Sequence, residues 1–210
     1  EYTRLNTGVD CEVIATEYAG HAVHIAKRIA QTNEEAAVIA CGGDGTLNEC
    51  AQGVYGFKNI MLGCYPCGTG NDFIKCFDVE RRHFRDISKL INGKNIKIDL
   101  ISCNDRIAVN NVNVGFDAEV AKRVVKYKKI TTGSKAYIMA LIQSFFSKTK
   151  FLFEIHTSTG FSAKRKFIFC NAGNGKVYGG GFVAAPKADC TDGELDFTCV
   201  TAVTRLKMLL

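Results

Sequence analysis

The chain has 210 residues, 47% of them hydrophobic and 23% charged, with 20 Gly and only 2 Pro. This composition is typical of a globular protein and excludes collagen-like and disordered chains. Residues 1–95 hold 10 basic and 12 acidic side chains, whereas residues 96–210 hold 17 and 9, so the net charge of +6 comes from the second half. The longest apolar stretch, residues 136–146, is far shorter than the ~20 residues that cross a bilayer, which argues against a membrane span.

The first 94 residues alternate apolar strands with amphipathic helices. Apolar residues recur at helical spacing between Val23 and Ala30, for example, which predicts a helix there. Strands joined by helices imply a parallel sheet. In chain order we expect strands at 11–15, 36–41 and 60–65, and helices at 20–31, 47–55, 73–77 and 81–91.

After Gly93 the pattern changes to the alternation of polar and apolar residues that is typical of antiparallel strands. We therefore predict two domains, 1–94 and 95–210, the second mostly β with inserted helices. In this half we expect strands at 95–102, 106–116, 151–157, 164–172, 181–186 and 194–200, a turn at Asn104 and Asp105, and helices at 117–129 and 134–146.

The ten cysteines lie in apolar segments such as AAVIAC, and nothing in the sequence resembles a signal peptide. We expect reduced thiols in a cytoplasmic protein. Cys64 and Cys67 form a CxxC pair, but there is no second such pair to complete a zinc site. We interpret both as packing residues.

The segment CGGDGTLNEC follows an expected strand directly. Thr46 and Glu49 have the spacing of a capping box, which would start a helix at Thr46 and leave Gly42, Gly43 and Gly45 in the preceding turn. Free N–H groups and the helix dipole make such a turn suitable for phosphate, although a tight turn without a ligand has the same pattern.

The segment CGTGND repeats this arrangement after the next expected strand, with Thr69 and Asp72 at the corresponding spacing. Loops after neighbouring parallel strands open on the same edge of a sheet, where open α/β folds bind ligands. Neither segment has the Gly-Lys-Ser/Thr of a Walker A loop or the third glycine of a dinucleotide fingerprint. Common NTPases and dehydrogenases are therefore disfavoured.

Together with NVGFDAEV at 113–120 and the Gly-rich block at 171–197, these two segments resemble the catalytic domain of the diacylglycerol kinase family. That family includes bacterial lipid kinases and the sphingosine and ceramide kinases, and is distantly related to NAD kinases. The resemblance implies a Rossmann-like α/β nucleotide-binding domain followed by a β-sandwich-like domain, with ATP and Mg²⁺ used to phosphorylate a lipid hydroxyl, diacylglycerol or a related lipid. Family members extend further at both ends, so we expect this chain to be a piece that lacks the first strand and the C-terminal part.

The resemblance also implies roles for individual residues. Asp192 falls where bacterial members place the base that takes the hydroxyl proton, with Glu194 beside it, and Asp44 is the rival base. Asp44, Asp189 and Asp192, with Glu194 and Asp196, are candidates for Mg²⁺ contacts. For the four acids at 189–196 the alternative is a turn at Asp192 and Gly193 that leads into a strand with exposed acids. Nucleotide contacts are implied for Gly42, Gly43, Asp44, Gly45, Thr46, Thr69, Gly70 and Asn71, with Asn48 and Glu49 as supports.

A kinase for a membrane lipid must reach the bilayer, so we expect a cytoplasmic protein with peripheral contact at the inner face of the membrane and no nucleic-acid partner. Basic and aromatic residues of the second half could make this contact, or could be solvated and buried residues without such a role. They are Lys122, Arg123, Lys126, Lys128, Lys129, Lys135, Lys148 and Lys150, with Phe145, Phe146 and Phe151. Two alternatives stay open: an NAD-kinase-type small-molecule kinase and a catalytically silent nucleotide-binding module.

Overall fold

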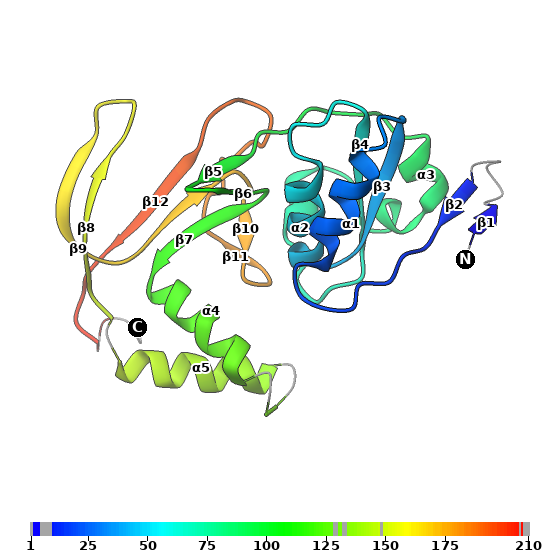
Figure 1. Cartoon of the computed structure of the whole chain (residues 1–210). Coiled ribbons are helices and arrows are strands. Elements are labelled where there is room, and N and C mark those ends of the chain that lie inside the picture. The colour runs from blue at the N-terminus through cyan, green and yellow to red at the C-terminus, as the bar shows by residue number, and fades with distance from the viewer. Residues whose placement is uncertain are drawn as a thin grey trace. The chain divides into compact units, whose positions relative to one another are not determined.

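The computed structural model describes residues 2–4, 10–127, 130–131, 134–147, 149–205 and 207. It forms two compact units (Figure 1). The first unit runs to Asn110 and takes in Asn174–Glu194, and the second holds Asn111–Gly173 and the stretch from Leu195 onward. The predicted boundary between the domains 1–94 and 95–210 stays a prediction; it falls inside the first of these units.

The centre of the first unit is a parallel strand pair. β3 (Ala36–Gly42) and β4 (Ile60–Pro66) pair in parallel along their whole length, as predicted. Between them the chain forms α2 (Asp44–Val54), which packs against α1 (His21–Ala30). Gly53 makes this approach possible, because a Cβ there would lie 2.7 Å from the Cβ of Ala26. The core around these elements is built from small apolar residues and a few large ones, such as Ala22, Ala26, Ala40, Leu47, Ala51 and Phe73.

Short elements complete the first unit. β1 (Tyr2–Arg4) and β2 (Asp10–Glu12) pair antiparallel, and β2 ends before Val13, so the strand expected at 11–15 is mostly wrong. The helices expected at 73–77 and 81–91 are reduced to the 3₁₀ turns η1 (Phe73–Cys76) and η2 (His83–Arg85) and the short α3 (Ile87–Ile91). Two antiparallel hairpins follow: β5 (Ile101–Cys103) with β6 (Arg106–Ala108), and β10 (Val177–Tyr178) with β11 (Phe182–Val183).

The second unit is a four-stranded antiparallel sheet with two helices. β9 (Ser162–Gly173) pairs with β12 (Asp196–Thr201) on one side, and with β7 (Asn111–Gly115) and β8 (Phe151–His156) on the other. α4 (Phe116–Tyr127) follows β7 and packs against α5 (Ser134–Phe146), whose bounds are those predicted. No helix in the described ranges is long and apolar enough to cross a membrane.

All ten cysteines are free thiols. Cys50, Cys170 and Cys190 are buried, and burial raises the pKa of the half-buried Cys64 to about 12. Cys64 thus packs as predicted, but the interpretation of Cys67 as a packing residue is wrong because its side chain is exposed. A thiol with so high a pKa stays protonated at neutral pH and is a poor nucleophile.

Candidate active site

The GGDGT segment forms the turn from β3 into α2. β3 ends at Gly42, Gly43 precedes the helix, and Asp44 is its first residue. The predicted capping box is wrong, because Thr46 already lies inside the first turn and no side chain caps this end. Within the described residues the N–H groups of Gly45 and Thr46 donate to no acceptor, and nothing lies within 4 Å of the place where a Cβ on Gly45 would stand. The turn therefore offers accessible donors to an anion.

The two polar residues that were expected to support this turn, Asn48 and Glu49, make hydrogen bonds with other segments instead. The Asn48 Oδ1 atom accepts a hydrogen bond from the Val109 N–H at 3.0 Å. The Glu49 carboxylate accepts one from the Gly20 N–H at 2.9 Å, at the start of α1. These contacts fix α2 to two other segments of the first unit.

The GGDGT turn and the following GTGND loop touch through their backbones. The Gly42 carbonyl accepts hydrogen bonds from the N–H groups of Cys67 and Gly68, at 2.9 and 3.2 Å. Gly43 and Gly68 lie so close that a Cβ on Gly68 would overlap the Gly43 backbone. The absence of a side chain at Gly68 therefore allows the two loops to touch, a role that the sequence motifs did not indicate.

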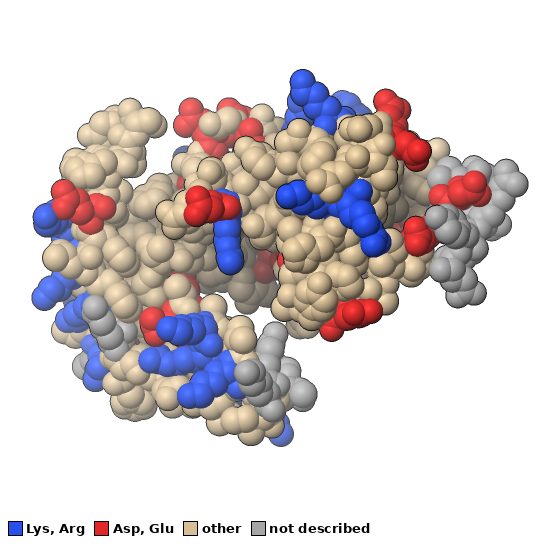
Figure 2. All heavy atoms as spheres, viewed as in Figure 1, with Lys and Arg blue, Asp and Glu red and all other residues tan. Residues whose placement is uncertain are grey.

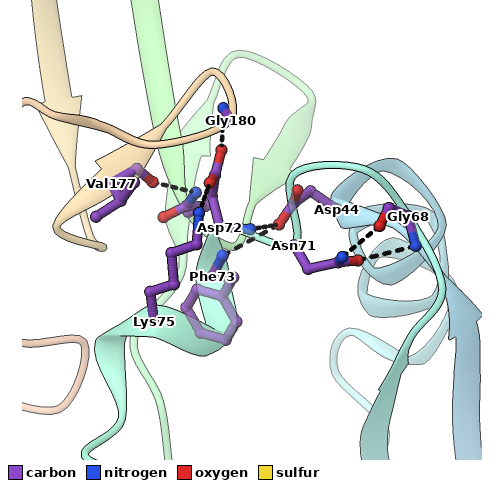
Figure 3. A network of polar contacts seen from close by, with 9 residues as sticks. Asp44, Gly68, Asn71, Asp72, Phe73, Lys75, Val177 and Gly180 are labelled. Atoms are coloured by element: carbon purple, nitrogen blue, oxygen red, sulfur yellow. Dashed lines mark hydrogen bonds and ion pairs between the residues drawn. The ribbon is translucent and has the colours of Figure 1, made fainter. Parts of the chain in front are cut away.

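Asp44 joins the two glycine-rich segments. Its Oδ1 atom accepts hydrogen bonds from the N–H groups of Asp72 and Phe73, at 2.7 and 3.0 Å, and so caps η1 (Figure 3). The predicted cap of η1 by Thr69 is wrong, because the residue directly before η1 is Asp72, and the side-chain acceptor at this end is Asp44. A Cβ on Gly70 would lie 3.2 Å from the second Asp44 oxygen, so Gly70 lies directly beside this carboxylate. Thr69 is exposed.

Asn71 shapes the loop instead of presenting its amide to a ligand. Its backbone has φ +47°, a left-handed conformation that Asn tolerates better than most residues. Its side chain is 3% exposed and makes two hydrogen bonds with the backbone of Gly68.

Asp72 brings a third segment to this site. Its carboxylate is nearly fully buried, with Oδ1 2.6 Å from the Lys75 Nζ atom and Oδ2 accepting a hydrogen bond from the Gly180 N–H at 2.6 Å (Figure 3). Gly180 is in the β10–β11 hairpin, where Gly179, Gly180 and Gly181 all have positive φ. The local sequence pattern indicated Asp72 only as part of a helix cap. Its pairing with a residue 108 positions away cannot be read from local spacing.

The acidic residues near Asp192 form a separate turn of the first unit. The Asp192 Oδ1 atom accepts a hydrogen bond from the Glu194 N–H at 2.9 Å, and the Gly193 N–H donates to Asp99 at 2.7 Å. Hydrogen bonds from the Thr191 hydroxyl and N–H lower the pKa of Asp189. Among the described residues no hydrogen bond or ion pair links Asp192 or Glu194 to Asp44 or to the 69–71 segment. Asp196 lies in β12, in the second unit.

Models of two known protein domains match the chain. A model of the diacylglycerol kinase catalytic domain matches residues 3–103, and a model of the YegS C-terminal NAD kinase beta sandwich-like domain matches residues 110–210. The chain belongs to the diacylglycerol kinase family. This confirms the predicted order of an α/β domain followed by a β-sandwich-like domain.

Curated proteins and a solved structure are similar to this chain over most of its length. A Klebsiella pneumoniae protein named "Probable lipid kinase YegS-like" is 29% identical over 92% of this chain and 65% of its own length. One from Pseudomonas aeruginosa with the same name is 31% identical over 77% of this chain and 53% of its own length. The crystal structure of a diacylglycerol kinase from Bacillus anthracis has a TM-score of 0.68 at 25% identity, over 93% of this chain and 63% of that one. The chain thus spans about half to two thirds of the relatives it matches.

Proposed function

We propose that the chain is the core of an ATP-dependent lipid kinase that transfers the γ-phosphate of ATP to a hydroxyl of diacylglycerol or a related lipid. The observation that carries this proposal is the first turn of α2, where no acceptor in the described part of the chain meets the Gly45 and Thr46 N–H groups and the Cβ position of Gly45 has no neighbour within 4 Å. Because the chain belongs to the diacylglycerol kinase family, we take the anion that binds at this turn to be a nucleoside triphosphate.

In this proposal one group of residues binds the phosphates and another residue accepts a proton. Gly42, Gly43, Asp44, Gly45 and Thr46 surround the phosphates, Thr69 and Gly70 line the same site, and Asn71 holds the shape of their loop through its hydrogen bonds with Gly68. Asp192 takes the proton of the lipid hydroxyl. The hydroxyl oxygen then bonds to the γ-phosphorus as the bond to the β–γ bridging oxygen breaks and ADP leaves. Phosphoryl transfer depends mainly on such positioning and on charge neutralisation.

Mg²⁺ would neutralise charge on the phosphates. The described residues contain no cluster of three or more acidic, His or Cys side chains able to hold a metal by themselves. Mg²⁺ is usually held by one or two carboxylates together with substrate phosphates and water, and that mode fits Asp44, whose Oδ2 atom has no hydrogen-bond partner among the described residues. Asp189 and Asp192 are the other candidates.

A kinase of the NAD-kinase type and a silent nucleotide-binding module are the alternatives.

As a lipid kinase, the protein would act at the cytoplasmic face of the membrane, as a peripheral protein, and would take part in phospholipid synthesis.

The proposal is tested by the transfer of label from γ-labelled ATP in the presence of Mg²⁺. The full-length protein is offered diacylglycerol, a sphingoid base and a polyprenol in detergent micelles, and NAD in a parallel reaction. We expect label in one lipid and none in NAD. Label in NAD alone would favour the small-molecule kinase, and ATP binding with no labelled acceptor would favour the silent module.

A further inference from the structure

α5 exposes its large apolar side chains and buries its small ones. Ala136, Ala140 and Ser144 recur every fourth residue, and each is 0% exposed. Ile138, Ile142 and Phe146 have the same spacing two positions later, which places them about 200° around the helix, and their exposure rises from 53% to 71%. The side of α5 opposite its buried stripe is therefore an apolar surface that none of the described residues covers. Tyr137, Met139 and Leu141 are also exposed and widen this surface.

Specific polar contacts fix the orientation of α5 on α4. The Arg123 guanidinium donates a hydrogen bond to the buried Ser144 hydroxyl at 2.7 Å. The Tyr127 hydroxyl donates one to the Gln143 side chain at 3.2 Å. Both α4 residues lie on one stripe, four positions apart. These contacts hold the stripe of small residues against α4. The stripe of Ile138, Ile142 and Phe146, on the opposite side of α5, therefore faces away from α4.

Positive charge is concentrated on α4 and at the start of α5. Residues 116–150 contain eight Lys and Arg but only two acidic residues. Lys122 and Lys126 are exposed on α4, next to Arg123 and Tyr127, and Lys135 is exposed on α5. Figure 2 shows Lys and Arg side chains gathered over these helices. Lys128, Lys129 and Lys148, which belong to the predicted basic patch, lie outside the described residues.

An anionic lipid leaflet fits both properties of this surface. A helix of 13 residues is about 20 Å long, too short to cross a bilayer but suited to lie in its plane. Apolar side chains on one side and lysines beside them are the pattern of interfacial helices that bind anionic lipids. A second copy of the chain would bring the same positive charge against this one, which disfavours self-association.

We propose that α4 and α5 form a membrane-docking surface in which Ile138, Ile142 and Phe146 insert among the acyl chains of an anionic leaflet. Lys122 and Lys126 contact the lipid phosphates. The choice of a bilayer as occupant rests on the proposed function, because a lipid acceptor is held in a membrane. Docking itself requires neither ATP nor acceptor.

The test is sedimentation of the full-length protein with vesicles that contain no diacylglycerol, in the absence of ATP. Vesicles of phosphatidylcholine alone are compared with vesicles that also contain phosphatidylglycerol. We expect binding to the second kind. The triple variant Ile138→Ser, Ile142→Ser, Phe146→Ser should bind at least about thirtyfold more weakly. The double variant Lys122→Gln, Lys126→Gln should bind about tenfold more weakly.

Two matched controls remove exposed side chains elsewhere. Leu152→Ser with Phe161→Ser removes exposed apolar side chains, and Lys94→Gln with Lys97→Gln removes two exposed positive charges. Both controls should bind as the wild type does, and thermal unfolding checks that every variant is folded. Equal losses in the controls and in the α4–α5 variants would overturn the proposal.

Three further results distinguish docking from self-association and from the proposed kinase activity. Vesicle binding unchanged in the triple variant, together with a change from dimer to monomer in light scattering, would assign the surface to a second copy and overturn docking. A wild-type protein that phosphorylates lipids in micelles but does not sediment with anionic vesicles would also overturn it. Vesicle binding that depends on the α5 stripe in a protein that phosphorylates no lipid would support docking and contradict the proposed function alone.

Discussion

The Asp192→Asn variant is expected to lose about a thousandfold in kcat for lipid phosphorylation while its affinity for ATP stays within about twofold. Asn has the same shape as Asp, and its Oδ1 atom can still accept the hydrogen bond from the Glu194 N–H that shapes the turn. The substitution therefore removes the proton acceptor and keeps the backbone. Transfer of labelled phosphate at saturating ATP measures kcat, and calorimetry measures the affinity for ATP.

The matched variant is Asp44→Asn, because Asp44 is the rival base. Its Oδ1 atom can still accept from the N–H groups of Asp72 and Phe73, so the contact between the two glycine-rich segments is kept. We expect this variant to act mainly on the binding of ATP with Mg²⁺. If kcat instead falls in Asp44→Asn with unchanged nucleotide affinity, and falls little in Asp192→Asn, then Asp44 and not Asp192 is the base.

The Gly68→Ala variant is expected to be less stable than the wild type by about 2–3 kcal/mol, because overpacking forces the backbone to shift. Its Cβ would overlap Gly43 and lie 3.0 Å from the Asn71 Oδ1 atom. For a protein of this size the loss corresponds to a fall of about 5–10 °C in the unfolding temperature. Because the shift would separate the two glycine-rich segments, phosphate transfer should fall as well.

Gly63→Ala is the control for this variant. Gly63 lies in the same strand that leads to Gly68, but a Cβ there would make only an ordinary contact, 3.5 Å from Ile39. It should unfold within a few degrees of the wild type. An equal loss at both positions would mean that Gly63 and Gly68 are needed for a reason other than the contact with Gly43.

Local sequence patterns predicted the elements of the site and missed the contacts between them. Two apolar runs correctly indicated β3 and β4, and the helix expected between them indicated their parallel pairing. The capping boxes failed because α2 begins at Asp44, two residues before Thr46. The Asp44 side chain instead reaches the loop 28 residues later, and sequence spacing carries no information about such a contact.

The α5 helix shows a different limit. Its bounds follow from the sequence, but its apolar residues surround most of the helix, so the sequence does not say which side is buried. The stripe of Ala136, Ala140 and Ser144 decides this, because small side chains allow the close approach of α4. Similarly, composition cannot reveal that Asn174–Glu194 packs with the first unit although it follows a strand of the second.

The most direct measurement is the affinity for ATP of the Gly45→Ala variant. A methyl group on Gly45 would meet no protein atom within 4 Å, and Ala favours a helix more than Gly does, so the fold should be at least as stable. If the phosphates lie against the first turn of α2, the methyl group occupies their space. Calorimetry should then show ATP binding at least about tenfold weaker than in the wild type. Unchanged ATP affinity in this folded variant would contradict the assignment of the GGDGT turn to the nucleotide phosphates.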